Sequence, residues 1–196
     1  MKIYLLFLFL CFNSIYSNQE NPAITKEHIS LSLHETMIND FLKGILPIKD
    51  KGEALLITYR WSLINPRIDI EKDTALFLSQ IEIKVGEFKT QKNVKGSVSV
   101  NFDNETDKII LKIEEAKVVL DVNIFGKEII LGELDIGKYF SEPFKLNGPS
   151  PISNNINYTL PNGDIRKIKV KTKKSKLILV KDAIQVITFL DFTKIE

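Results

Sequence analysis

The residues best suited to catalysis or metal binding are few, and they are unevenly spread along the chain. Both histidines, His28 and His34, fall in one short segment, and the one cysteine is Cys11. A serine hydrolase of the common type presents its serine in G-x-S-x-G, and a zinc protease uses H-E-x-x-H, but the sequence contains neither motif. Phosphate-cradling glycine motifs are also missing. We therefore expect no catalytic residues, no metal site and no cofactor, and we interpret the protein as a non-enzyme.

Two acidic runs have the alternating spacing of a calcium loop. They are Asp69-x-Glu71-x-Asp73 and Asp103-x-Glu105-x-Asp107. A calcium loop of the EF-hand type needs oxygen ligands on alternate residues and a glycine at the sixth position. Neither run has that glycine, so solvated carboxylates in turns are the favoured interpretation.

A row of lysines is the most prominent charged pattern, and it consists of Lys167, Lys169, Lys171 and Lys173. Alternate side chains of a strand share a face, so the four ammonium groups are expected on one side of a strand. Such a stripe could make peripheral contact with an anionic membrane surface, such as phospholipid or lipopolysaccharide headgroups. The alternative is an edge strand whose lysines prevent it from pairing with another chain.

Residues 1–17 are typical of a secretion signal. Lys2 gives a basic start, Ile3 to Phe12 is an apolar stretch of about ten residues, and Ser17 provides a small residue for cleavage. The apolar stretch is shorter than the roughly 20 residues of a membrane span. We predict cleavage near Ser17 and an exported protein, periplasmic or secreted, that is soluble afterwards. A lipid anchor would instead need Cys11, which lacks the small preceding residues that such a site prefers.

Loss of the signal would leave a nearly neutral chain. The 27 Lys and Arg residues and 25 Asp and Glu residues become 26 and 25 when Lys2 is removed. This balance argues against nucleic acid as a partner. The cysteine is lost as well, so the domain must be held by its core, and about 180 residues suffice for one domain. We expect a single α+β domain over residues 18–196, and its oligomeric state stays open.

One amphipathic helix is expected at about residues 33–46. Ser32 and Glu35 match the S-x-x-E capping box, while Gly44 and Pro47 are typical of a helix end. The apolar residues that share one side of this helix are Leu33, Met37, Ile38, Phe41, Leu42 and Ile45. The polar residues expected on the opposite side are Glu35, Asn39, Asp40 and Lys43.

Most of the remaining chain alternates with a period of two, which is typical of β-strands. Strands are expected at about residues 53–131 and 156–192, with an irregular connection at about 132–155 that contains several prolines. The connections between strands are too short for parallel crossovers. The expected fold class is therefore α+β, with a long curved antiparallel meander wrapped around one long N-terminal helix.

Several apolar motifs resemble those of a known family. They are Ile29-Ser30-Leu31-Ser32, Glu35-x-Met37-Ile38-Asn39-Asp40-Phe41-Leu42, Gly96-x-Val98-x-Val100-x-Phe102-Asp103 and Ile109-Ile110-Leu111. In this order, and behind a signal, they resemble the DUF1439 lipoproteins of Gram-negative envelopes, which are compared in fold with the tubular lipid-binding (TULIP) superfamily. The resemblance covers residues 29–122 and implies a sheet curved around the helix with a hydrophobic groove between them. The chain departs from the family where the lipid-attachment cysteine should be, and no ligand residue carries over by motif.

The expected function is therefore non-catalytic binding of a lipid or another apolar small molecule. The candidate ligand-contacting residues on the helix and on the first strand after it are Met37, Phe41, Ile45, Leu55, Ile57, Tyr59 and Trp61. The alternative is that these side chains simply fill the core, as most apolar stripes do. The protein would then be a structural or envelope-interaction protein without a ligand.

Overall fold

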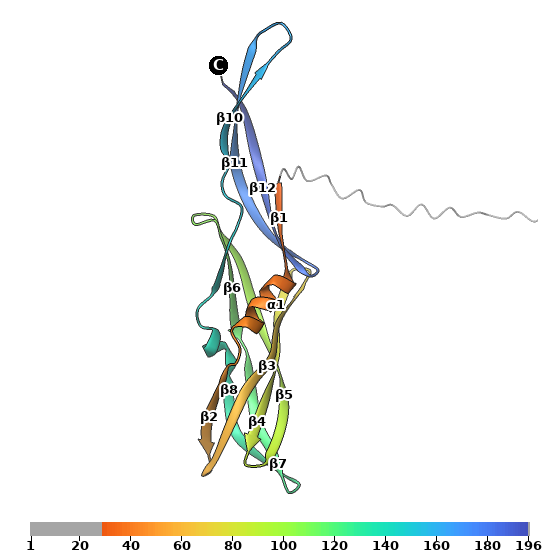
Figure 1. The fold of residues 1–196 in the computed structure, drawn as a ribbon, viewed down its shortest axis with the longest axis vertical. Coiled ribbons are helices and arrows are strands. Elements are labelled where there is room, and N and C mark those ends of the chain that lie inside the picture. Colours follow the sequence, from red (N-terminus) through yellow and green to blue (C-terminus); the bar gives the residue numbers. More distant parts are fainter. Residues whose placement is uncertain (1–28, 196) are drawn as a thin grey trace, which may run out of the picture.

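The computed structural model describes residues 29–195, which form an elongated and mainly antiparallel β-protein (Figure 1). The predicted signal and its cleavage point lie outside the described residues. The elements in chain order are β1 (Ile29–His34), α1 (Glu35–Gly44), β2 (Lys49–Ala54), β3 (Ile57–Glu71), β4 (Thr74–Val85), β5 (Phe88–Asp103), β6 (Lys108–Glu115), β7 (Lys117–Ile124), β8 (Lys127–Asp135), the 3₁₀-helix η1 (Ile136–Phe140), β9 (Phe144–Asn147), β10 (Ser153–Thr159), β11 (Ile165–Val180) and β12 (Ala183–Ile195).

A six-stranded antiparallel sheet forms one half of the molecule. Its strand order is β2-β3-β4-β5-β6-β9, so five consecutive strands form a meander and β9 is added at the far edge. Alternate residues point inward, and the most deeply buried include Ile68 on β3, Phe77 on β4 and Leu111 on β6. The hairpin β7–β8 forms a separate two-stranded sheet, and an ion pair of 2.7 Å joins Asp121 on β7 to Lys92 on β5.

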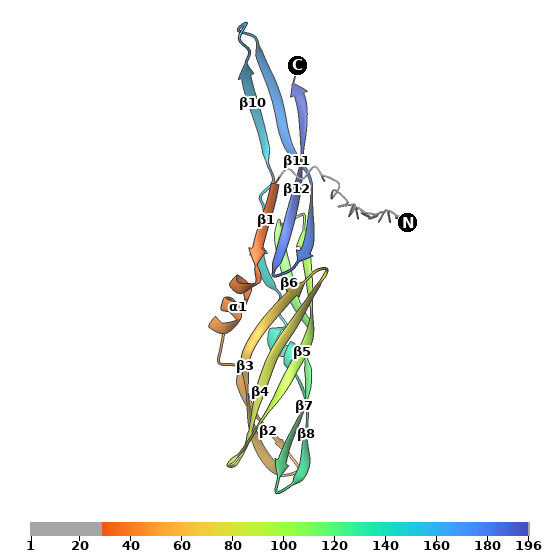
Figure 2. The same cartoon turned by 90° about the vertical axis from the view of Figure 1, so that its right-hand side faces the viewer.

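A second sheet extends the molecule in the other direction (Figure 2). Its strand order is β1-β12-β11-β10. The base of this sheet contributes the buried residues Ile184 and Val186 of β12 to the same hydrophobic core as the first sheet. The far end, where β10 pairs with the first half of β11, projects beyond the core as a long hairpin.

Strand β3 continues through the dipeptide Asn65-Pro66. Asn65 has a positive φ of 51°, and the register with β4 shifts between Ile64 and Arg67. This bulge removes Pro66, which has no N–H group, from the hydrogen-bonded ladder. The buried hydroxyl of Ser79 donates to the carbonyl of Ile64 at 2.8 Å. The strand therefore keeps its hydrogen bonding on both sides of the proline.

The predicted helix is shorter than expected at both ends. Residues 29–34 pair with residues 183–188 of β12, so Ser32 and Leu33 belong to β1 and the capping box is not formed. The cap is instead His34, whose Nδ1 accepts the Thr36 N–H at 3.3 Å. The helix ends at Gly44, ahead of the cis Leu46–Pro47 peptide.

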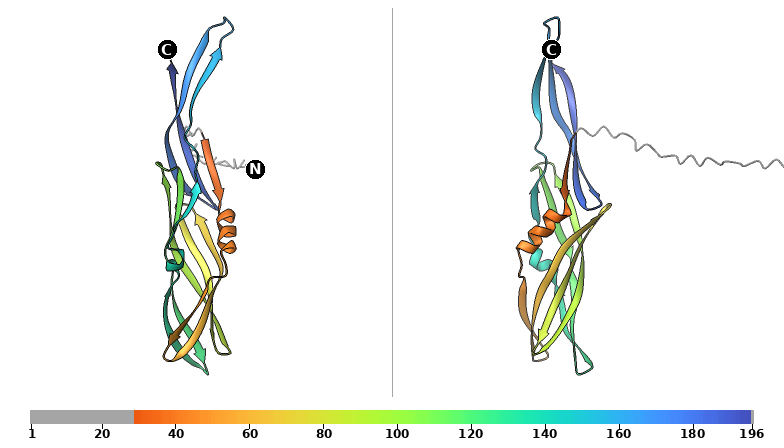
Figure 3. Two further views of the ribbon diagram at one scale, coloured as in Figure 1. Left: turned by 60° about the vertical axis from the view of Figure 1, so that its left-hand side comes forward. Right: turned by 45° about the vertical axis from the view of Figure 1, so that its right-hand side comes forward.

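The expected α+β class with strands wrapped around a long helix is therefore wrong. The described chain is mainly antiparallel β, divided into three sheets, and its one α-helix has ten residues. Helix α1 lies against one side of the six-stranded sheet and is not enclosed by it (Figure 3). The physical reason is that side chains of the strands and of η1 fill most of the core. The helix contributes Ile38 and Leu42 to it and covers one edge of β3.

The predicted irregular connection at residues 132–155 contains regular structure. It includes the end of β8, the helix η1, the strand β9 and the beginning of β10. In η1, Ile136 and Phe140 are buried, and Phe140 packs against Phe77 with ring centroids 5.4 Å apart. This segment therefore fills the core and places β9 beside helix α1.

Candidate functional site: an apolar groove beside helix α1

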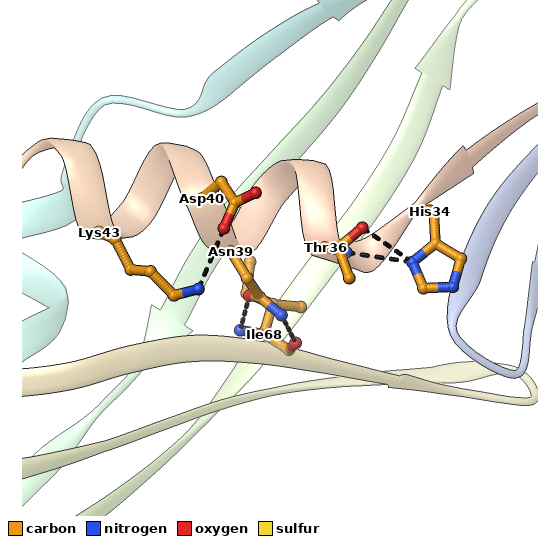
Figure 4. Close-up of polar contacts among 6 residues, drawn as sticks. All are labelled: His34, Thr36, Asn39, Asp40, Lys43 and Ile68. Atoms are coloured by element: carbon orange, nitrogen blue, oxygen red, sulfur yellow. Dashed lines mark hydrogen bonds and ion pairs between the residues drawn. The ribbon is translucent and has the colours of Figure 1, made fainter.

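Helix α1 is fixed to β3 by a side chain that takes the place of a neighbouring strand. Strand β2 pairs with β3 only as far as Ser62, so the edge of β3 near Ile68 has no strand beside it. The Asn39 amide donates to the Ile68 carbonyl at 3.0 Å, and the Asn39 carbonyl accepts the Ile68 N–H at 2.7 Å (Figure 4). Both backbone groups of this buried residue are thereby paired.

The backbone groups of Ile70, the next inward-pointing residue on this edge of β3, are paired in a similar way. The Glu35 carboxylate accepts the N–H of Ile70 at 2.9 Å, and the N–H of Asp182 donates to the Ile70 carbonyl at 2.8 Å. Asp182 lies in the turn between β11 and β12, and its own carbonyl accepts the N–H of Glu35 at 2.9 Å. Helix, edge strand and turn are therefore joined by one set of hydrogen bonds.

These contacts divide the predicted polar side of the helix. Asn39 points toward β3 in Figure 4, and Glu35 accepts a hydrogen bond from the same strand. Asp40 and Lys43 instead form an exposed ion pair, at 3.0 Å. The predicted apolar side is divided as well. Ile38 and Leu42 are buried, whereas Met37 and Phe41 are 45 % and 53 % exposed.

The exposed apolar side chains of the helix line a groove between α1 and β9. The groove has a volume of about 480 Å³. Its lining residues are Met37, Ile38, Phe41, Leu111, Glu142, Pro143, Phe144, Lys145 and Leu146. The Phe41 ring meets the Phe144 ring edge to face, with centroids 5.2 Å apart. Leu111 pairs with Phe144 across the β6–β9 ladder and is fully buried, which places it at the groove floor.

The seven predicted ligand-contacting residues do not meet in one place. Met37 and Phe41 line the groove, but Ile45 follows the helix end and does not. Leu55 is at the tip of the β2–β3 hairpin and is 77 % exposed. The other three, Ile57, Tyr59 and Trp61, pack in or against the core. The groove residues Glu142 and Pro143 and those of β9 were missed because they lie in the stretch expected to be irregular.

The predicted lysine stripe lies on the projecting hairpin. Lys167, Lys169 and Lys171 are exposed on one face of β11, and Lys173 sits at the bulge between Thr172 and Lys174. Strand β11 is paired with β10 on one side and β12 on the other over this stretch. The edge-strand interpretation is therefore wrong, while contact with an anionic surface stays a prediction.

A tyrosine beside the six-stranded sheet has a shifted pKa. The Tyr139 hydroxyl donates to the Asp50 carboxylate at 3.2 Å, and its ring packs edge to face on Trp61, with centroids 5.1 Å apart. Burial, followed by the nearby Asp50 carboxylate, raises the pKa of Tyr139 above its usual value. The phenol is therefore held in its neutral form, which makes it a hydrogen-bond donor and a poor base.

The two acidic runs lie at turns. Asp73 is at the β3–β4 turn, and Asp103 begins the β5–β6 turn, where it accepts hydrogen bonds from the Glu105 N–H at 2.9 Å and the Thr106 hydroxyl at 2.5 Å. These bonds, that from Thr106 first, lower the pKa of Asp103. Within residues 29–195, no group of three or more His, Cys, Asp or Glu side chains is placed to hold a metal ion.

Comparisons with known proteins identify no family for this chain. No protein-family model matches the sequence, and a search of curated proteins found no significant relative. In the part of the chain that the structure describes, no helix is long and apolar enough to cross a membrane. The functional interpretation therefore rests on the groove beside α1 and on the residues that line it.

Proposed function

We propose that this is an exported, non-catalytic binding protein that holds an apolar ligand, such as the acyl chain of a lipid, in the groove between α1 and β9. The observation that carries the proposal is the pair of exposed side chains Met37 and Phe41 facing a recess with a buried apolar floor. Ligand pockets have typical volumes of roughly 300–1,000 Å³ and mostly apolar linings. The volume of about 480 Å³ lies in this range.

The rim of the groove supplies the polar groups that an amphipathic ligand would need. Lys145 and Glu142 both line it and are exposed. An ammonium group beside an apolar recess suits a fatty acid, whose carboxylate could pair with Lys145 while its chain lies on Phe41 and Leu146. Glu142 disfavours a second anionic group at the same rim.

The experiment is a titration with a fatty acid that carries a dansyl group, whose directly excited fluorescence rises when the group leaves water. The wild-type protein is expected to bind it saturably, and unlabelled palmitate is expected to displace it. Met37→Trp should fill the groove and weaken binding by roughly tenfold, because it removes the space for several methylene groups. Ile45→Trp is the matched control, since Ile45 is also exposed near the helix end but does not line the groove.

A second readout is mass spectrometry of lipids extracted from the protein purified from cells. Recovery of a stoichiometric lipid that Met37→Trp excludes would support the proposal. Absence of saturable binding, together with absence of any extracted lipid, would favour the alternative of a structural or envelope-interaction protein without a ligand. Equal binding by both tryptophan variants would place the ligand elsewhere.

A further inference from the structure

Large apolar side chains occupy the hairpin tips at the end of the molecule opposite the projecting β10–β11 hairpin. The hairpins β2–β3, β4–β5 and β7–β8 all turn at this end (Figures 1 and 3). Leu56 is 95 % exposed at the first tip, beside Leu55, and Phe125 is 91 % exposed at the third. Phe125 meets Phe88 of the second hairpin edge to face, with centroids 5.5 Å apart. The second and third tips are therefore in contact, and the first tip lies at the same end of the molecule (Figure 1).

The backbone at these tips disfavours the side chains that occupy it. Leu55 and Leu56 form a two-residue loop with φ of 51° and 65°, and Phe125 has φ of 52° beside Gly126 at 80°. Positive φ at both central positions is the type I′ turn, for which Asn-Gly is strongly preferred. Leucine and phenylalanine at such positions add strain and bury little surface in return. Folding therefore does not account for them.

A row of basic side chains crosses the outer face of the sheet behind the tips. Direct register partners run from Lys51 on β2 to Arg60 on β3, Lys84 on β4 and Lys89 on β5. Like charges directly opposite one another destabilise a sheet. Glu82 lies among them, 3.0 Å from Lys84 and 2.5 Å from Lys89. Lys51 and Arg60 are three register pairs from the turn, or about 10 Å along the strands.

We propose that this end of the protein docks on an anionic phospholipid bilayer. Leu55, Leu56 and Phe125 enter the interface, where amphipathic proteins bury apolar side chains to a depth of roughly 5–10 Å. The row from Lys51 to Lys89 then lies at the level of the headgroup phosphates. Separate protruding tips fit a deformable lipid surface better than a rigid protein partner, because each tip can be solvated by lipid independently.

The local charges define how strong the preference for anionic lipid should be. Glu53, Glu87 and Glu128 are exposed close to the tips and partly offset the basic row. The apolar tips are therefore expected to give weak binding to neutral vesicles, and the basic row to add a salt-sensitive preference for anionic ones. This inference concerns a different surface from the groove and holds whether or not the groove binds a ligand.

The test is flotation of the mature protein with vesicles of phosphatidylcholine alone or with about 30 % phosphatidylglycerol. Leu55→Asn with Leu56→Gly installs the preferred turn sequence, so the fold is retained while the apolar tip is lost. We expect this variant to lose at least about tenfold in binding, and Phe125→Asn to weaken it further. Glu82→Gln frees Lys84 and Lys89 and should strengthen binding to anionic vesicles by about fivefold, with no gain on neutral ones.

Two controls separate this surface from the other candidate surfaces. Neutralising the opposite end with Lys167→Gln, Lys169→Gln and Lys171→Gln should leave vesicle binding unchanged. Met37→Trp, which fills the groove, should also bind vesicles normally. The inference is overturned if the wild-type protein does not float, if the Asn-Gly variant floats as well as wild type, or if only the Lys167–Lys171 variant loses binding. Tip-dependent self-association without flotation would also overturn it, since the occupant would then be a second copy.

Discussion

The Asn39 side chain offers the most quantitative test of how α1 is held. In Asn39→Ala, the N–H and C=O of Ile68 lose their partners at 2.7 and 3.0 Å. Ile68 is fully buried, so each unpaired backbone group costs about 1–3 kcal/mol. Alanine is the better helix former and returns about 0.5 kcal/mol. The two groups together cost about 2–6 kcal/mol, so the free energy of unfolding is expected to fall by about 1.5–5.5 kcal/mol.

The assay is urea unfolding followed by the fluorescence of Trp61, the one tryptophan of the chain, which is buried. Asp40→Ala is the matched control on the same helix. It removes an exposed ion pair with Lys43, which is worth at most about 0.5 kcal/mol. A loss for Asn39→Ala of less than about 0.5 kcal/mol, equal to that of the control, would refute the interpretation of Asn39 as a substitute for a strand.

Three further predictions concern turns and close contacts. Replacing Leu55 and Leu56 by Asn and Gly should raise the free energy of unfolding by about 1 kcal/mol, since positive φ then costs less. Gly96→Ala should lower it by about 1–3 kcal/mol because its Cβ would overlap a backbone carbonyl of β6, whereas Gly44→Ala, with open space around it, should not lower it. The pKa of Asp103 is lowered in the folded state. Its contribution to the free energy of unfolding is therefore present above its ordinary pKa and is lost as pH falls through the folded value. Asp103→Asn should flatten the acid side of the stability profile measured by urea unfolding.

Local patterns in the sequence predicted local structure well. The alternation of Leu55, Ile57, Tyr59, Trp61 and Leu63 predicts one dry strand face. The last four lie in or against the core, whereas Leu55 is an exposed turn residue. Helix residues were identified within about two positions at each end, as expected for a strongly periodic segment. The antiparallel pairing of successive strands followed from the short connections between them.

Contacts between distant segments could not be predicted in the same way. The contact of Asn39 with β3 could not be predicted because its partner, the edge of β3 at Ile68, is 29 residues away and is left uncovered only because β2 is short. Ser32 could not act as a helix cap because pairing with Gln185 on β12 places it in a strand. Part of the polar side of the helix therefore packs against β3, and part of its apolar side lines the groove.

The central claim is that this groove holds an apolar ligand, and methyl NMR of the protein titrated with palmitate tests it most directly. Saturable chemical-shift changes are expected at Met37, Leu111 and Leu146, with little change at Leu177, which packs against the core but does not line the groove. No shift at these three methyl-bearing residues at saturating palmitate, or shifts confined to the tip residues Leu55 and Leu56, would contradict it.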